Sequence, residues 1–209
     1  MNDVVAWIVA VPIAYLIGAI PTGYLFGKVW RGVDVRRYGS GGTGFTNVMR
    51  TLGRTAALTV LAIDIAKGAI PVAIAIFLTE EELIRAVAGS AAVIGHVYPI
   101  YTRFEGGRGV ATAFGALVIL SPYSAGAAAV GLLIIAATRY VSAGSLSGTA
   151  IAALTMIVLV IIGHHTPGLI VFVIAILIFI PIRHVGNIER LISGTERQIE
   201  ATADPRRRR

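Results

Sequence analysis

The sequence contains no cysteine, and only 14% of its 209 residues are charged. Without cysteine the chain forms neither a disulfide framework nor a thiolate metal site, and the redox state of its compartment stays open. Acidic residues are scarcer than basic ones, with 11 Asp and Glu against 18 Lys and Arg. Apolar residues make up 56% of the chain, a balance that excludes an ordinary soluble domain. The composition therefore indicates a membrane protein.

Four long stretches of the chain carry no charged residue. The first lies between Asp3 and Lys28 and has 24 residues, enough for a helix to cross a hydrocarbon core about 30 Å thick. It is too long for a cleaved signal peptide and has too little positive charge before it, so we interpret it as an uncleaved span. The other three stretches are 86–102, 109–138 and 140–182.

Helix breakers divide the two longest uncharged stretches. Ser121-Pro122 interrupts the first of them, and GHHTPG at 163–168 interrupts the second. The fourth resulting span has about 13 residues, which is short for a crossing, so a re-entrant course or a locally thinned bilayer stays open for it. The sequence thus predicts seven spans, roughly 4–26, 55–78, 84–102, 109–121, 122–138, 144–163 and 167–183.

Basic residues gather in the segments that follow spans one, three, five and seven. Of the 18 Lys and Arg, 16 lie in 27–54, in 103–108, at Arg139 and in 183–209. Seven spans place these segments on one face, which the positive-inside rule makes cytoplasmic. We therefore predict an all-α integral membrane protein, a single bundle of seven transmembrane helices with its N-terminus outside and its C-terminus in the cytoplasm. Basic loops beside spans are typical of topology and lipid contact, so we expect no nucleic-acid binding and a disordered basic tail at 201–209.

Glycine and arginine recur together in two of the inner segments. The first, GSGGTGFTNVMR at 39–50, combines glycines that can bare backbone N–H groups with hydroxyl donors and Arg50. In the second, GGRG at 106–109, the glycines surround Arg108, and a helix is expected to start directly afterwards. Both segments predict phosphate-binding loops, although a merely flexible loop would explain the first one alone.

Two further groups of polar residues stand out. In RHVGNIERLISGTE at 183–196, His184, Asn187 and Arg190 are three apart and would share one face of a helical turn, where they could bind an anion and assist proton transfer. An ordinary interfacial helix fits the same pattern. Asp64 and Lys67 lie three apart inside the second span, so they should pair with each other or with a ligand. A purely structural pair that fixes helix packing is the competing interpretation.

These segments resemble, in order, spacing and membrane context, the bacterial acyl-phosphate-dependent glycerol-3-phosphate acyltransferases, the PlsY family. The residues that carry the resemblance are GSGGTGFTNVMR, DIAKGAIP, GHVYPIYTRFEGGRGVAT and HVGNIERLISGTE. The resemblance implies transfer of a fatty acyl group from long-chain acyl phosphate to the 1-hydroxyl of sn-glycerol 3-phosphate, giving lysophosphatidate and phosphate without a cofactor or metal. It places the active site on the cytoplasmic face of a bacterial inner membrane. It leaves open a functional coupling to the enzyme that makes the acyl phosphate.

The resemblance also implies roles for individual residues. The active site would form from the inner loops 27–54, 103–108 and 183–200. Catalytic roles fall on Ser40, Arg50, His184 and Asn187. Substrate binding falls on Gly39, Gly41, Thr43, Thr46, Asn47, Lys67, Gly106, Gly107, Arg108, Gly109, Arg190 and Glu196.

The chain departs from the family's pattern at four positions. Gly42 replaces a usual asparagine, Phe45 a usual alanine and Arg108 a usual lysine. Glu105 replaces a frequent basic residue and is expected to place a negative charge near a phosphate site. The chain shares with the family the absence of the His-Asp box of other glycerolipid acyltransferases, because none of its four histidines is followed by an aspartate after four intervening residues.

The sequence leaves open two questions about the mechanism and the question whether the protein is an enzyme or a transporter. The proton of the acceptor hydroxyl could pass to His184 or to the departing phosphate. Ser40 could orient a phosphate or carry the acyl group transiently, and direct transfer is favoured because no histidine neighbours it in sequence. A transporter of small phosphorylated anions would use Asp64 and Lys67 as a gate. The gathering of polar residues on one face favours the enzyme.

Overall fold

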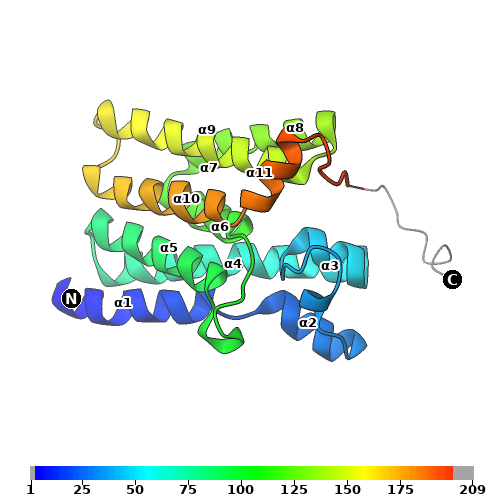
Figure 1. Ribbon diagram of the computed structural model, residues 1–209. Coiled ribbons are helices and arrows are strands. Elements are labelled where there is room, and N and C mark those ends of the chain that lie inside the picture. The colour runs from blue at the N-terminus through cyan, green and yellow to red at the C-terminus, as the bar shows by residue number, and fades with distance from the viewer. Residues whose placement is uncertain (1–2, 200–209) are drawn as a thin grey trace, which may run out of the picture.

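The computed structural model describes residues 3–199 as helices joined by short turns (Figure 1). The long helices lie side by side along one common direction, and the short helices α2, α3 and α11 gather toward one end. The basic tail 201–209 lies outside the described residues. The α-helices are α1 (Asp3–Gly18), α2 (Thr22–Arg31), α3 (Phe45–Leu52), α4 (Arg54–Leu78), α5 (Glu82–Val97), α6 (Val110–Leu120), α7 (Pro122–Ala128), α8 (Val130–Thr138), α9 (Val141–Ile161), α10 (Ile170–Ile182) and α11 (Val185–Ile192). The 3-10 turns are η1 (Val35–Arg37), η2 (Ile100–Thr102) and η3 (Pro167–Leu169).

Length and composition identify the helical runs that can cross a membrane. Four qualify: Asp3–Arg31, Arg54–Leu78, Glu82–Thr102 and Val141–Ile161. The pair Pro167–Ile182 and Val185–Ile192, bent by 62°, is a fifth candidate, whereas Val110–Leu120 and Pro122–Thr138 are shorter apolar helices. Each of the seven predicted spans overlaps one of these segments. The prediction of helices throughout is therefore confirmed for the described residues, with four, or five with the bent pair, that are long and apolar enough to cross a membrane.

The first span differs from the prediction, because the helix breaks in its middle. α1 ends at Gly18 and α2 begins at Thr22, with Pro21 between them. Proline lacks the N–H that would continue the helical ladder, so the break frees backbone carbonyls. The buried ammonium of Lys67 on α4 donates a hydrogen bond to the carbonyl of Ile20 at 2.8 Å. The same carbonyl accepts from the Thr22 N–H at 2.9 Å, so Lys67 adds a second donor at the break and ties α4 to it.

Small residues allow the helix backbones to approach closely. A Cβ atom on Gly68 of α4 would overlap the backbone of Thr112 on α6, and one on Gly115 of α6 would overlap the backbone of Ile65. α8 and α9 meet through glycines in the same manner. Such contacts between small residues are the usual way in which membrane helices pack without a hydrophobic driving force. They align α4 with α6 and α8 with α9 as two walls.

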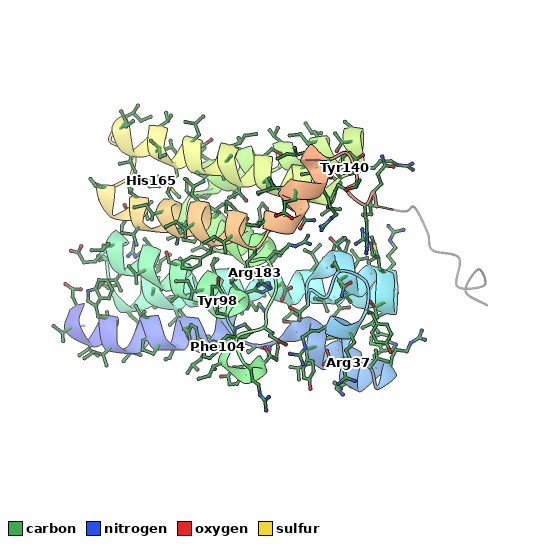
Figure 2. All side chains as sticks on the ribbon, viewed as in Figure 1. Arg37, Tyr98, Phe104, Tyr140, His165 and Arg183 are labelled. Carbon is green, nitrogen blue, oxygen red and sulfur yellow. The ribbon has the colours of Figure 1, made fainter. Side chains whose placement is uncertain are left out.

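The two ends of the bundle carry different charges. His165 lies at the end that holds the N-terminus, and Arg37 and Tyr140 lie at the opposite end (Figure 2). At the first end the carboxylate of Glu82 approaches His165 to 3.7 Å. The glycine-rich segment before α3 and the basic residues around it lie at the second end, which is where the sequence predicts the cytoplasmic loops.

Candidate active site

Two cavities meet at the basic end of the bundle. One is polar and has a volume of about 470 Å³, and the other is apolar, has a volume of about 490 Å³ and runs between the α4–α6 wall and the α8–α9 wall. The polar cavity is lined by eleven of the predicted site residues: Gly39, Ser40, Gly41, Thr46, Arg50, Gly106, Gly107, Arg108, Asn187, Arg190 and Glu196. Six residues line both cavities: Ser40, Gly42, Thr46, Gly107, Arg108 and Val141. A ligand with a charged head and an apolar tail could therefore occupy both cavities at once.

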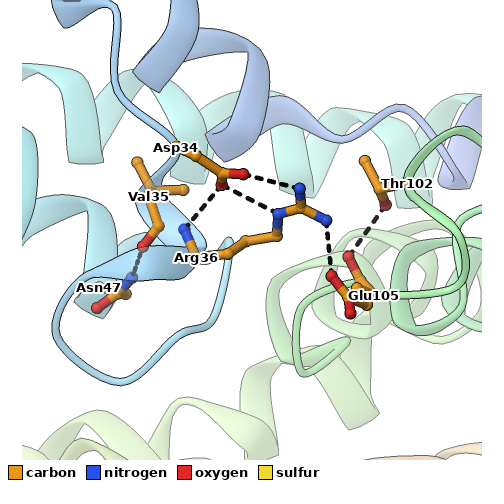
Figure 3. Close-up of polar contacts among 6 residues, drawn as sticks. All are labelled: Asp34, Val35, Arg36, Asn47, Thr102 and Glu105. Atoms are coloured by element: carbon orange, nitrogen blue, oxygen red, sulfur yellow. Dashed lines mark hydrogen bonds and ion pairs between the residues drawn. The ribbon is translucent and has the colours of Figure 1, made fainter.

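Asn47 on α3 holds the first glycine-rich loop in shape. Its side-chain N–H groups donate to the carbonyls of Val35 at 2.9 Å and Gly42 at 2.7 Å, and its side-chain oxygen accepts from the N–H of Ser40 at 2.8 Å (Figure 3 shows the first of these bonds). Gly39 has φ of 60°, and a Cβ there would overlap the Asn47 oxygen. Asn47 is buried, and these bonds occupy its amide. The residue positions Ser40 at the junction of the cavities.

Glu105, which the sequence predicts to lie near a phosphate site, directs its charge to Arg36. Its carboxylate accepts a hydrogen bond from Arg36 at 2.8 Å, and its carbonyl accepts one from the Thr102 hydroxyl at 3.0 Å (Figure 3). Arg36 also bonds Asp34, and this hydrogen bond lowers the pKa of Asp34 to about 2. Glu105 is not among the described residues that line either cavity. It instead ties the loop before α6 to the turn after α2.

Arg183 and His96 hold the second glycine-rich loop. The Arg183 guanidinium donates to the carbonyls of Gly106 at 2.9 Å and Gly107 at 3.2 Å. The N–H of Gly107 donates to the carbonyl of His96 at 3.1 Å, and a Cβ on Gly107 would overlap the His96 ring. α6 begins at Val110, directly after the loop, as predicted. The loop therefore presents Arg108 to both cavities and the start of α6 to the apolar one.

The third motif forms around the carboxylate of Glu196. One oxygen accepts from Asn187 at 2.6 Å and from the Ser142 hydroxyl at 2.8 Å, and the other accepts from Arg190 at 2.7 Å. Asn187 and Arg190 thus point from the same face of α11, as their spacing predicts. The Glu196 side chain is only 6% exposed. Burial raises the pKa of Glu196, but the hydrogen bonds from Asn187, Ser142 and Arg190 outweigh burial and leave the pKa below its ordinary value.

His184 lies in the bend between α10 and α11 and lines the apolar cavity. Its ring nitrogen Nδ1 is 2.8 Å from the carbonyl oxygen of Ile180. A carbonyl only accepts, so we assign the proton to Nδ1, which leaves Nε2 with its lone pair. The residue is 1% exposed. His184 is therefore a buried imidazole whose Nε2 is the proton acceptor when the ring is neutral.

Five predicted site residues are not among the described residues that line the polar cavity: His184 and Asn47, which line the apolar one, and Thr43, Lys67 and Gly109. Lys67 and Thr43 are buried and are not among the described residues that line either cavity, and Gly109 lines only the apolar one. Lys67 forms an ion pair with Asp64 at 3.0 Å, so the two charges meet inside the bundle as predicted. Thr43 packs its backbone against Gly23 of α2. These contacts support the packing interpretation of Lys67.

Sequence reasoning did not single out Ser142 or Arg183, which both line the polar cavity. Arg183 directly precedes His184 at the end of a span, where an arginine was attributed to topology alone. Ser142 follows Tyr140 and Val141 with no motif around it. Only the folded chain brings these two side chains to the loops that they bind.

Positive charge dominates the polar cavity. Burial lowers the pKa of Arg108, the nearby Glu196 opposes this, and the positive charges of Arg190, Arg50 and Arg183 lower it further. Excess positive charge together with glycine-rich backbone suits phosphate or carboxylate ligands. Within residues 3–199, no three His, Asp or Glu side chains are grouped so as to hold a metal ion.

A family model described as glycerol-3-phosphate acyltransferase matches residues 8–194 of the chain. The chain belongs to this family. Among members of the family, the glycerol-3-phosphate acyltransferase of Trichlorobacter lovleyi is 43% identical over 189 residues, covering 90% of this chain and 95% of the relative. The one from Geobacter sulfurreducens is 43% identical over 190 residues, with the same coverage.

Solved structures of the family agree with the fold described above. The glycerol 3-phosphate form of PlsY, an integral membrane glycerol 3-phosphate acyltransferase, superposes with a TM-score of 0.85 at 36% identity and covers 93% of this chain and 96% of its own. Its lysophosphatidic acid form has a TM-score of 0.82 at the same identity, covering 92% and 94%. The chain is thus a membrane-embedded member of the glycerol-3-phosphate acyltransferase family, and the resemblance seen in its sequence is confirmed.

Proposed function

We propose that the protein transfers a fatty acyl group from long-chain acyl phosphate to the 1-hydroxyl of sn-glycerol 3-phosphate, giving lysophosphatidate and inorganic phosphate. The observation that carries this proposal is the junction of the polar and apolar cavities at Ser40, Gly107 and Arg108. A phosphate head and an acyl tail need such a pair of environments side by side. The solved relative is described in forms with glycerol 3-phosphate and with lysophosphatidic acid, which supports the same acceptor and product here.

The polar cavity would hold the two phosphate groups together. Arg50, Arg108 and Arg190 line it and supply the cations that offset repulsion between two phosphates. The guanidinium of Arg108 can bind a phosphate bidentately, whereas a lysine ammonium would act as a point charge. Ser40 and Thr46 add hydroxyl donors. We assign Ser40 to orienting a phosphate, and Lys67 to helix packing and not to substrate binding.

The chemistry needs orientation and charge stabilisation more than a strong nucleophile. The oxygen of the acceptor hydroxyl bonds to the acyl carbon, the bond from that carbon to the phosphate oxygen breaks, and phosphate leaves with the bonding electrons. The hydroxyl proton moves to a base, and Nε2 of His184 is the side-chain nitrogen placed for this role, with the departing phosphate as the competing acceptor. Holding both substrates in one site supplies the remaining acceleration.

Replacing His184 with Ala tests its role as the base. We expect kcat at saturating substrates to fall by roughly a hundredfold, because general base catalysis contributes on that order. His164→Ala is the matched control, since His164 lies next to Tyr123 at the far end of the bundle. Turnover of the His184 variant within about threefold of the wild type would assign the proton to the departing phosphate.

We also propose that the protein crosses a bacterial inner membrane seven times, with this site on the cytoplasmic face. The charge difference between the two ends of the bundle supports this orientation. α6 and the α7–α8 pair would complete the crossings with shorter helices, which a locally thinner bilayer accommodates.

The experiment that tests the reaction uses protein purified in detergent with labelled glycerol 3-phosphate. Palmitoyl phosphate and palmitoyl-CoA are supplied in parallel as donors. We expect labelled lysophosphatidate from palmitoyl phosphate alone. Product from palmitoyl-CoA alone would reassign the donor, and product from neither, with folded protein, would refute the proposed reaction.

A further inference from the structure

We infer that the end of the apolar cavity farthest from the polar cavity, called its inner end below, sets the acyl-chain length that the enzyme accepts. Ala152 of α9 and Leu117 of α6 form this end. The inference rests on the proposed function, because it takes the apolar cavity as the acyl site. It adds which residues the end of the chain would meet.

One face of α9 lines the apolar cavity along most of its length. The lining residues lie at alternating spacings of three and one, which is one side of a helix: Val141, Gly144, Ser145, Gly148, Thr149 and Ala152. The 11 steps from the first to the last correspond to roughly 16 Å at the helical rise. Val141 also lines the polar cavity, so it marks the head end. Ala152 is therefore the lining residue of α9 farthest from the phosphates.

α6 leaves the polar cavity in the same way. Arg108 lines both cavities just before the helix starts, and the lining continues through Ala113 and Phe114 to Leu117. α7 and α8 run antiparallel to α9, with Ile135 of α8 against Gly144 near the head end and Ala128 of α7 against Gly148 farther in. The cavity thus deepens from the head toward Leu117, Ala128 and Ala152.

The core of the bundle closes the cavity beyond these residues. Leu117 and Ala152 belong to one buried apolar cluster together with Leu120 and Met156, neither of which is among the described residues that line the cavity. The Met156 sulfur in turn lies 4.0 Å from the Ser124 hydroxyl of α7. A chain that follows the α6 and α9 walls inward would meet Leu117 and Ala152 and then packed core.

The size of these two side chains should therefore determine which acyl phosphate fits. Ala152→Leu adds three carbon atoms at the inner end, and each methylene that no longer fits costs roughly fourfold in binding. Leu117→Ala removes three carbon atoms and deepens the cavity at the same place. The first change should shorten the preferred chain, and the second should lengthen it.

The test is a competition between two acyl phosphates for glycerol 3-phosphate, with the purified protein in detergent and the lysophosphatidates quantified by mass spectrometry. With palmitoyl and lauroyl phosphate, we expect Ala152→Leu to lower the palmitoyl to lauroyl product ratio by about tenfold or more. With stearoyl and palmitoyl phosphate, we expect Leu117→Ala to raise the stearoyl share by about fourfold. The ratio within one reaction is independent of any loss in total activity.

Matched controls make similar changes of side-chain size on the outer faces of the same helices. Ala150→Leu on α9 and Val118→Ala on α6 alter exposed residues and should leave both ratios as in the wild type. Ratios that stay unchanged in both inner variants while the wild type makes product would overturn this inference alone and indicate a tail that leaves sideways between α4 and α8. Where Ala152→Leu fails to fold, Leu117→Ala decides the question. A wild type that uses no acyl phosphate would refute the proposed function instead.

Discussion

Asn47 makes three hydrogen bonds to backbone atoms around its own loop, and Arg183 makes two to the loop that contains Gly106 and Gly107. The hydrogen bonds of both side chains are made to the protein's own backbone. Glu196 likewise accepts hydrogen bonds from Asn187 and Arg190 and so fixes their positions. At the scale of single residues the site therefore has two layers, one that faces the cavities and one that holds the first in place.

Arg183 should be a positioning residue for the glycine-rich loop. We expect Arg183→Lys to raise the KM for glycerol 3-phosphate by roughly tenfold, because an ammonium cannot make the same two parallel bonds, and Arg183→Met to raise it further. Steady-state kinetics of the purified enzyme measure both. Arg31→Met, at an exposed position on α2, is the control. Partial recovery of the Met variant with added guanidinium would support the role, and an unchanged KM in both variants would contradict it.

Glu196 should make stability depend on pH in a defined direction. Its pKa in the fold lies below its ordinary value of 4.5, so the carboxylate stabilises the fold above that pH, and this contribution is lost as the pH falls through the lowered pKa. We expect Glu196→Gln to unfold at a lower temperature than the wild type at neutral pH. The difference between the two unfolding temperatures should stay constant down to about pH 5 and narrow below about pH 4.5.

Thermal unfolding in detergent between neutral and acidic pH measures this difference. Glu189→Gln is the control, because Glu189 is exposed on α11, the helix that precedes Glu196. A difference that widens on acidification would show that Glu196 carries a raised pKa, and the assigned hydrogen bonds would then be wrong.

At the scale of elements, glycine contacts determine how close the walls of the apolar cavity stand. α4 and α6 touch backbone to backbone at Gly68 and Gly115, and α8 and α9 touch at Gly131 and Gly144. The apolar cavity lies between these two tight pairs. Side chains larger than glycine at these positions would shift a whole wall.

Gly115→Ala should destabilise the bundle. Its new methyl group would overlap the backbone of Ile65, which cannot rotate away, and overpacking of this kind costs about 1–3 kcal/mol. The unfolding temperature in detergent measures the effect. Gly126→Ala on α7 is the matched control, because nothing lies within 4 Å of the added methyl group and alanine favours a helix. Equal unfolding temperatures for the two variants would contradict the close contact of α4 and α6.

At the scale of the whole molecule, one end of the bundle is basic and contains the site, and the other contains Asp3, Glu82 and His165. The Thr79 hydroxyl donates to Asp3 at 2.8 Å and Glu82 accepts from Thr166, so the second end has its own polar contacts. The separation along the helix direction is visible in the positions of Arg37 and His165 (Figure 2). Such asymmetry is what the positive-inside rule uses to orient a membrane protein.

The absence of cysteine makes the orientation directly testable. Arg37→Cys and Glu81→Cys each introduce one thiol at an exposed position, at the basic end and in the α4–α5 turn. We expect an impermeant maleimide added outside intact cells to label position 81 and to reach position 37 only after the membrane is opened. The opposite pattern would reverse the proposed orientation.

The sequence alone was sufficient for several particular features. The Ser121-Pro122 break, the start of α6 after Gly109 and the pairing of Asp64 with Lys67 all follow from local rules of propensity and from the high cost of charge in hydrocarbon. The roles of Lys67 and Glu105 could not be predicted in this way. Lys67 donates a hydrogen bond to the carbonyl of Ile20 at the helix break, 47 positions away. Glu105 pairs with Arg36, 69 positions away.

By itself, the sequence determined the membrane environment, the approximate spans and the family, because composition, hydrophobic length and local motifs act over short stretches of chain. Only the tertiary structure decided that the motifs share one polar cavity, that this cavity continues into an apolar one, and that Arg183, Ser142 and Asn47 hold the loops in place. Those facts depend on contacts between residues far apart in the chain, and helix packing alone sets such contacts.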